Sequence, residues 1–380
     1  MKTLVNAHAI SCQPDNAVYQ ALVEKAGRII YAGDCIPPQY RNWPRIDLEH
    51  KCVVPAFVDT HMHFASFAFF HSGLDCRHAS SLLELGDFIR DHIDRNSSDK
   101  LHMGFGCSAH TLREKHLPTG SDLDAITPMP LMLIKYDGHA AVANRAMVKR
   151  LPKAVFNCRG YCRKSGWFYQ EAFYRAVRAI SRSVPLFKVL KNTIRGADAI
   201  IRKGIGLAHT AEGVGFPRDM DVDLMRFADR GLPPAFRTYF QTLAVSKVRK
   251  RGLPRIGGCF ETALDGCFGS QDAALRTSYH NNPDSTGFLA HTQKRVNRFV
   301  HEAHRSNLQV AIHAIGDAAI AQALDAYEAA HKRTPRDDPR HIIIHADLMP
   351  PGLIERAARM KVAIALQSPF LIDFEIERVA

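Results

Sequence analysis

Short apolar runs recur from residue 53 to residue 368, and longer stretches of mixed apolar and polar residues separate most of them. The runs are rich in Val, Ile, Ala and Phe, as buried parallel strands are. The predicted strands are residues 53–59, 204–210, 235–241, 258–264, 308–314, 341–346 and 361–368. The predicted helices include residues 188–203, 293–306, 317–331 and 351–360. This alternation predicts parallel βα units and an α/β fold, with a barrel as the leading candidate.

Two other parts of the chain follow different patterns. The first 52 residues contain short alternating segments and turn residues, which predict a small β-domain. Residues 64 to about 187 are too many for one crossover between parallel strands, and they contain a further strand-like segment at 131–139. We interpret this stretch as an insertion after the first barrel strand. The sequence thus predicts two domains, residues 1–52 and 53–380.

Composition is that of an ordinary globular protein, with 46% hydrophobic and 23% charged residues among 380. Apolar runs are too short to span a membrane, and the N-terminus lacks the apolar core of a signal peptide. The nine cysteines are scattered and form no Cys-x-x-Cys pair. A reduced, cytoplasmic location without a membrane partner is the simplest interpretation.

The formal net charge of +12 raises the question of nucleic acid binding. Basic residues cluster at 247–255 and 331–341, where they could attract nucleic acid or an anionic substrate. Aromatic residues do not interleave with these clusters, and no recognition motif accompanies them. A solvated basic surface is the better interpretation, so we expect no nucleic acid partner.

The apolar run at 53–64 ends in two histidines one residue apart, His61 and His63. Side chains alternate along a strand, so both imidazoles point to one face and Met62 points to the other. Neutral imidazole is a common zinc ligand, and the pair could supply half of a metal site. A chance His-x-His is nevertheless expected in a chain with 20 histidines.

Three further metal-ligand side chains lie in later predicted strands: Glu261, His313 and His345. In a (β/α)8 barrel the functional residues gather at the C-terminal ends of several strands. Taken singly, each histidine could be a hydrogen-bonded core residue, and Glu261 could pair with a nearby arginine. Together with the first pair they predict a site for one or two divalent ions, with zinc as the expected metal.

The order His-x-His, acidic residue, His, His resembles the amidohydrolase superfamily, and more closely its amidohydrolase-3 branch. The resemblance extends over most of the chain. Members of the branch labelled exoenzyme regulatory protein are among the similar proteins. The motifs that carry it are GRIIYAG, VDTHMHF, SDLDAITPMPLMLIKYDGHAAVANRAM, GCFETALDGCFGSQDAAL, VAIHAIGDAAI and RHIIIHADLMPPGLIERAARMKVAIALQSPF. It implies a (β/α)8 TIM barrel joined to a small β-sandwich domain.

The resemblance also implies a site and a reaction. His61 and His63 would bind the more buried ion, and His313 and His345 would bind the second. Glu261 would bridge them, in the position where many relatives have a carboxylated lysine. A metal-activated hydroxide would attack a non-peptide, amide-like C–N bond of a small molecule.

The candidate catalytic residues are His345 and His139. His139 matches a recurrent family position in the insertion, from which it could contact substrate. Ordinary packing of the insertion is an equally good explanation of this residue.

Two departures from the family pattern affect the expected activity. The chain ends at Ala380, soon after the seventh predicted strand, and lacks the Ser-Asp-x-Pro motif of the family's eighth strand. Asp373 and Glu375 fall beyond that strand and are not expected to replace the aspartate. The C-terminal strands of the β-sandwich are also missing. We therefore expect an incomplete barrel whose unpaired edges favour homo-oligomers.

Without that aspartate the general base is absent, and this role is worth roughly 10²- to 10⁴-fold in rate. The alternative to a metal-dependent hydrolase is thus a truncated, catalytically impaired homologue with a regulatory or binding role.

Overall fold

The computed structural model describes residues 1–367 except 137, 139 and 215. This part of the chain divides into two compact units. The first contains residues 1–58 and 204–206, and the second contains the remaining residues. The sequence placed the corresponding boundary at residue 52. Among the described helices, none combines the length and apolar character needed to cross a membrane.

The N-terminal unit consists of two small sheets. Their strands are β1 (Lys2–Val5), β2 (His8–Ile10), β3 (Val18–Tyr19), β4 (Ala21–Lys25), β5 (Arg28–Gly33), β6 (Arg45–Asp47) and β7 (Cys52–Val53). One sheet has the order β5-β4-β1-β6 and the other β3-β2-β7. Both contribute to one apolar core around Ala7, Ala9 and Leu22. Its predicted identity as part of a β-sandwich stays a prediction.

The second unit is built on a parallel sheet of seven strands, which forms a nearly closed barrel. These are β8 (Phe57–Met62), β15 (Ile205–Glu212), β16 (Ala235–Phe240), β17 (Arg255–Ala263), β18 (Gln309–Ala314), β19 (Ile342–His345) and β20 (Ala363–Ala365). Strands that follow one another in this series are neighbours, with β8 and β20 at the edges. Each of the seven predicted strands corresponds to one of them. The α/β barrel prediction is thus confirmed at the level of seven strands.

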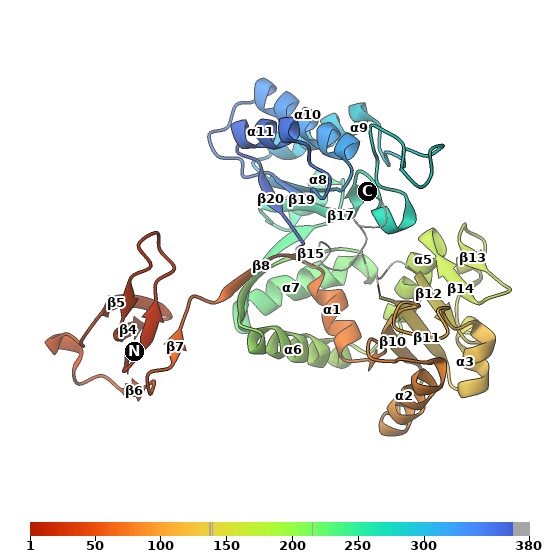
Figure 1. Ribbon diagram of the computed structural model, residues 1–380, viewed down its shortest axis with the longest axis horizontal. Helices are drawn as coiled ribbons and strands as arrows, with labels where there is room; N and C mark the ends of the chain where they lie inside the picture. The colour runs from red at the N-terminus through yellow and green to blue at the C-terminus, as the bar shows by residue number, and fades with distance from the viewer. Residues whose placement is uncertain (137, 139, 215, 368–380) are drawn as a thin grey trace. The chain divides into compact units, whose positions relative to one another are not determined.

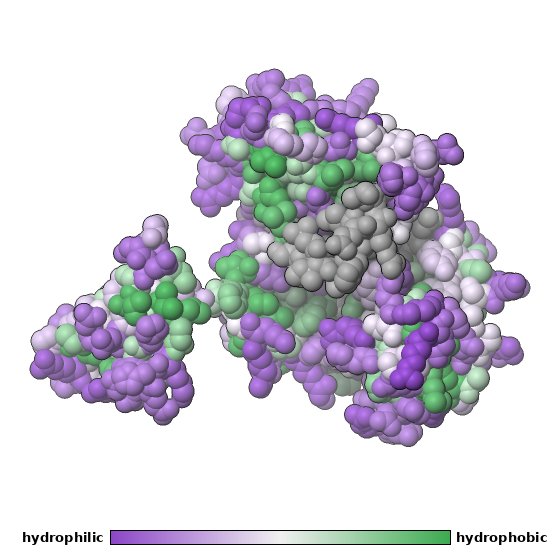
Figure 2. Space-filling view, viewed as in Figure 1, coloured by the Kyte–Doolittle hydropathy of each residue, from purple (hydrophilic) through white to green (hydrophobic). Residues whose placement is uncertain are grey.

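Helices cover the outer face of this sheet (Figure 1). They are α6 (Leu186–Arg202), α7 (Met220–Gly231), α8 (Val245–Lys250), α9 (Gln293–Arg305), α10 (Asp317–Arg333) and α11 (Pro351–Arg359). Each of the four predicted helices overlaps α6, α9, α10 or α11. Polar side chains cover the solvent side of α10 and α11 (Figure 2).

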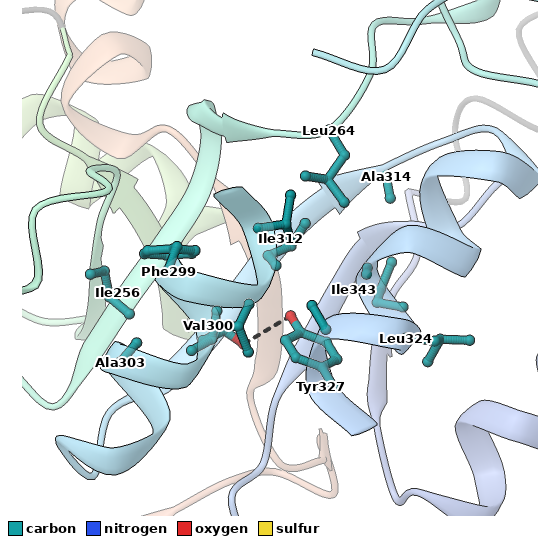
Figure 3. Packing of buried hydrophobic residues seen from close by; sticks show 14 of the residues in the cluster. Ile256, Leu264, Phe299, Val300, Ala303, Ile312, Ala314, Leu324, Tyr327 and Ile343 are labelled. Carbon is teal, nitrogen blue, oxygen red and sulfur yellow. Dashed lines mark hydrogen bonds between the residues drawn. The ribbon is translucent and has the colours of Figure 1, made fainter. Parts of the chain in front are cut away.

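The largest apolar core lies between α9, α10 and strands β17 to β19 (Figure 3). Val300, Ile312 and Leu324 are among its fully buried members. The hydroxyl of Tyr327 crosses this core and donates a hydrogen bond to the carbonyl oxygen of Ile342, at 2.8 Å. Because this polar group is satisfied, the aromatic ring can be buried without an unpaired hydroxyl. The core therefore holds these helices firmly against the strands that carry the site.

Residues 63–204 connect β8 to β15 and contain a second sheet, of order β13-β14-β12-β11-β10-β9. Its strands are β9 (Leu74–Asp75), β10 (His102–Cys107), β11 (Leu131–Lys135), β12 (Ala140–Ala143), β13 (Tyr161–Cys162) and β14 (Trp167–Tyr169). Besides α6, the α-helices here are α1 (Phe64–His71), α2 (Leu82–Arg95), α3 (Gly120–Ile126), α4 (Arg145–Val148) and α5 (Gln170–Ser181).

Strand β11 shows how this second sheet is packed. Leu131 and Leu133 belong to one apolar core, whereas Met132 and Ile134 belong to another. Alternate side chains therefore point to opposite faces, and both faces are buried. A sheet covered on both sides explains why the sequence shows a continuous apolar run at this point rather than an alternation.

Candidate metal centre

His61 and His63 lie at the C-terminal end of β8, as the sequence predicts. Their ring centroids are 5.1 Å apart. A carboxylate oxygen of Asp59 accepts a hydrogen bond from the backbone N–H of His61 at 3.0 Å and fixes the end of the strand. Nδ1 of His63 lies 3.0 Å from the carbonyl oxygen of Ala211. A carbonyl only accepts, so Nδ1 carries the proton and Nε2 holds the lone pair, as in many metal-ligating histidines.

The two later histidines join this pair. His345 ends β19, and its ring centroid lies 5.9 Å from that of His61. His313 in β18 lies 4.5 Å from His345, between ring centroids. Nε2 of His313 donates to the carbonyl oxygen of Gly266 at 3.2 Å, which places its lone pair on Nδ1. The structure thus brings together all four predicted histidines, from three strands far apart in the sequence.

The electrostatics of the site favour the neutral form of His61. Burial lowers the pKa of His61 well below its usual value, and the neighbouring His63 and His313 lower it further. His209, on β15, also contributes to this lowering, and burial lowers its own pKa. A metal ion binds imidazole in the neutral form, so the protonation state that the protein imposes is the ligating one.

Glu261 is not part of this group. Its side chain is exposed, and its carboxylate accepts a hydrogen bond from the backbone N–H of Leu243 at 3.3 Å. Cys259, on the same strand, takes the inward position instead. The ligand atoms of His61, Cys259 and His345 all lie within 4.8 Å of one another. The thiol of Cys259 was not singled out by the sequence analysis.

An irregularity in β17 accounts for the difference between Cys259 and Glu261. Gly258 pairs with Ile312 and Ala263 with His313, so the residues between Gly258 and Ala263 have no partner in the β18 register. Phe260 has a φ of 52°, in the left-handed region. A regular strand would direct residues 259 and 261 to one face, but a bulge with a left-handed residue breaks that alternation. The predicted role of Glu261 as a bridging ligand therefore remains a prediction.

Two buried polar residues hold the group in place and were missed from the sequence. Gln241, which follows β16, donates from Nε2 to the carbonyl oxygen of Ala211 at 2.9 Å. Its Oε1 accepts the backbone N–H of Cys259 at 2.9 Å. One side chain thus connects the carbonyl that orients His63 with the residue that carries the thiol. A polar residue ending an apolar strand was the only available signal.

Asp265 is the second of these residues. Its carboxylate accepts backbone N–H groups of Ala274, Ile315 and Gly316 at 2.8 to 3.0 Å, and one of its oxygens lies 3.6 Å from Nε2 of His313. Burial raises the pKa of Asp265 to about 6, against the effect of these hydrogen bonds. The residue ties the loops after β17 and β18 together beneath His313.

The donor set fits a divalent transition metal. Imidazole nitrogens and a thiolate are the ligands of zinc and similar ions, whereas magnesium and calcium prefer oxygen. The predicted substrate contact, His139, lies outside the described residues.

Comparison with known proteins agrees with this geometry. The model of the Amidohydrolase family matches residues 45–159 and 257–378, which is more than half of the chain. The matched ranges contain all four histidines of the group and Cys259.

Individual relatives have low sequence identity, but the similarity extends over most of this chain. Protein LONG AFTER FAR-RED 3 of Arabidopsis thaliana is 26% identical over 86% of this chain and 60% of its own length. The exoenzymes regulatory protein AepA of Pectobacterium carotovorum is 25% identical over 96% of this chain and 83% of its own length. The chain thus spans about three fifths of the first of these relatives.

A solved structure shares the fold. It is that of an uncharacterized metal-dependent hydrolase from Pyrococcus horikoshii, with a TM-score of 0.79 and 24% identity over 98% of this chain and 75% of that one. Together with the family match, this confirms the resemblance found in the sequence. The chain belongs to the amidohydrolase family.

Proposed function

We propose that this protein is a metal-dependent hydrolase that cleaves an amide-like, non-peptide C–N bond of a small molecule. The observation that carries the proposal is the convergence of four histidines from β8, β18 and β19. Membership of the amidohydrolase family implies a divalent metal ion, and the nitrogen and sulfur donors favour zinc.

In this proposal four histidines bind metal and Gln241 positions them. His61, His63, His313 and His345 would hold the ion or ions, with the tautomers of His63 and His313 set by backbone carbonyls. A bound divalent ion polarises a substrate carbonyl and lowers the pKa of water. Gln241 would keep the backbone around the ligands fixed, so that no reorganisation is needed during reaction. The catalytic roles predicted for His345 and His139 belong to this proposal.

The alternative, a catalytically impaired homologue with a regulatory role, is not favoured by the geometry. Burial and the neighbouring His63 and His313 lower the pKa of His61, an arrangement that is unfavourable whenever this imidazole carries a proton. A bound cation would turn the same arrangement into a favourable one. The ligand group is therefore easier to explain as a metal centre in use than as a remnant.

The remaining expectations extend the proposal. We propose a small-molecule partner, a cytoplasmic location and no nucleic acid or membrane partner. We also propose that the edges of the seven-stranded sheet favour homo-oligomers, which light scattering coupled to gel filtration would detect.

Metal content tests the proposal directly. Protein purified without chelator should contain one or two equivalents of a divalent transition metal by mass spectrometry, and it should hydrolyse some members of a panel of N-acyl and N-formyl amines. The double variant His61→Ala/His63→Ala should lose the metal and the activity. A matched control, His8→Ala/His78→Ala, replaces two exposed histidines and should change neither. Absence of stoichiometric metal in the unaltered protein would contradict the proposal.

A further inference from the structure

Cys259 occupies the inward position of β17 opposite two histidines. Its Sγ lies 3.5 Å from Nε2 of His61. Its ligand atom also lies within 4.8 Å of that of His345, which is buried. The three side chains come from β17, β8 and β19, so the barrel itself, rather than a local loop, brings them together.

The separation of Cys259 from His61 matches that of two ligands of one metal ion. Zinc lies about 2.3 Å from a thiolate sulfur and about 2.0 Å from an imidazole nitrogen. In a tetrahedral site these bond lengths separate sulfur from nitrogen by about 3.5 Å. The observed separation of Cys259 Sγ and His61 Nε2 is 3.5 Å. The ligand atom of His345 lies within 4.8 Å of both, so a movement of this side chain toward them would make it the third ligand of such a site.

The backbone around Cys259 holds the thiol in this position. Its N–H donates to Oε1 of Gln241, and its two neighbours, Gly258 and Phe260, have φ values of 130° and 52°. An added Cβ at Gly258 would lie 2.8 Å from the side chain of Gln241, which leaves room for glycine alone. This backbone conformation directs the thiol of Cys259 toward the histidines and the carboxylate of Glu261 away from them.

We propose that the Cys259 thiolate is a protein ligand of the metal centre, together with His61 and His345, and that it is the ligand supplied by β17. This inference rests on the proposed metal-dependent function. On binding, the S–H bond gives its proton to solvent and a sulfur–metal bond forms, so that one proton is released for each ion bound at this position. A thiolate in the site selects zinc or cobalt over magnesium, manganese or calcium.

Cobalt substitution provides a test that does not depend on catalysis. The metal-free full-length protein is reloaded with Co²⁺, and its near-ultraviolet spectrum is recorded. A thiolate ligand produces an intense sulfur-to-cobalt charge-transfer band, which nitrogen and oxygen ligands do not. We expect the band in the unaltered protein and in Glu261→Gln. We expect its loss in Cys259→Ser, together with a zinc affinity at least 10- to 100-fold lower.

Controls separate this inference from the proposed function. Cys267→Ser replaces a nearby partly buried thiol and should keep the band. Circular dichroism and thermal unfolding establish that each variant folds, and Cys259→Ala serves as a second variant should the serine perturb the strand. Cobalt bound without the band, or a band that survives in both Cys259 variants, would overturn the thiolate ligand and leave the metal centre intact. Failure of the unaltered protein to bind cobalt or zinc would overturn both.

Discussion

Strand β19 carries buried histidines at both of its ends, and the two ends differ in what the imidazoles do. At the C-terminal end His345 lies among the rings of His61 and His313. At the N-terminal end, His341 immediately precedes the strand. Its Nε2 lies 2.8 Å from Nδ1 of His304, which belongs to α9. His345 and His341 share residue type and burial, so neither property distinguishes a metal centre from a structural pair.

Hydrogen bonding distinguishes them. Nδ1 of His341 accepts the backbone N–H of Val310 at 3.1 Å, so its proton lies on Nε2 and is donated to Nδ1 of His304. Nε2 of His304 then donates to the carbonyl oxygen of Thr334 at 2.7 Å. Every nitrogen of the pair is used inside the protein. Around the candidate metal centre, by contrast, His63 and His313 each hydrogen-bond through one ring nitrogen to a backbone carbonyl, that of Ala211 or Gly266, and not to a second histidine.

The largest expected effect is the loss of stability when acid protonates the structural pair, His304 and His341. Burial and the neighbouring His304 lower the pKa of His341 from 6.5 to about 3. The folded state therefore binds fewer protons than the unfolded state, whose histidine titrates near 6.5. This contribution is fully present above pH 6.5 and is lost as the pH falls toward 3. Between pH 6.5 and 4 we expect a loss on the order of 3 kcal/mol in the free energy of unfolding.

Urea unfolding of the metal-free protein at several pH values measures this loss. His341→Phe, which preserves the stack on Tyr327, is the matched variant, because Asp265 and the other buried carboxyls contribute equally in both proteins. The difference between the two proteins in the pH dependence of the free energy of unfolding is the contribution of the His304–His341 pair. Parallel curves would show that His341 does not carry the acid sensitivity.

Removing one member of the pair should cost nearly as much at neutral pH. His304→Ala leaves the Nε2–H of His341 and the carbonyl of Thr334 without their partner and opens a cavity in the core. We expect a loss of about 3 kcal/mol in the free energy of unfolding, from unsatisfied groups and lost packing. Chemical denaturation measures it. Zinc content should be unchanged, and a loss of zinc would erase the distinction between the two groups.

Removing one of the four histidines of the candidate metal centre should do the opposite: it should weaken metal binding and leave stability nearly unchanged. His345→Asn should lower zinc affinity at least roughly 100-fold, because it deletes a ligand outright. The stability of the metal-free protein should change by less than about 1 kcal/mol, since an amide replaces a ring of similar polarity. Competition with a chromogenic chelator measures the affinity. Metal binding equal to that of the unaltered protein would exclude His345 as a ligand.

The smallest effect is expected at the residue that only positions the ligands. Gln241→Ala should weaken zinc binding by roughly 10-fold, because Ala211 and Cys259 lose a shared partner while each ligand remains. Gln322→Ala is the matched control. It removes another buried glutamine whose Nε2 donates to a backbone carbonyl, that of His291, and not to the carbonyl that orients His63. Equal affinities for the two variants would argue against a positioning role for Gln241.

The sequence located the strands and most of the candidate ligands because both depend on local pattern. Buried parallel strands are continuous apolar runs, and the end of each run identified where His61, His313 and His345 would lie. The connection between β8 and β15 was recognised as too long for a crossover. Its internal sheet was largely missed, since only the run at 131–139 had a strand-like composition, and β9, β13 and β14 have at most three residues each.

The histidines of the structural pair show the limit of the same pattern. His341 and His345 flank one apolar run, so the sequence gives them equivalent positions. Whether an imidazole becomes a ligand depends on what its two nitrogens meet, and those partners come from residues far away in the chain. Val310, Thr334 and Ala211 contribute only backbone atoms, which leave no trace in the choice of residue.

The parallel barrel strands, and the strand ends at which the four histidines lie, could be predicted from the sequence because apolar runs are local properties. The family could be predicted from its motifs. The side chain of β17 that faces the histidines could be identified only from the folded structure. Regular alternation would place Cys259 and Glu261 on one face, but the bulge that accommodates residues 259–262 against β18 turns the thiol inward and the carboxylate outward. A bulge is a property of two paired strands, and the sequence of one strand does not contain it.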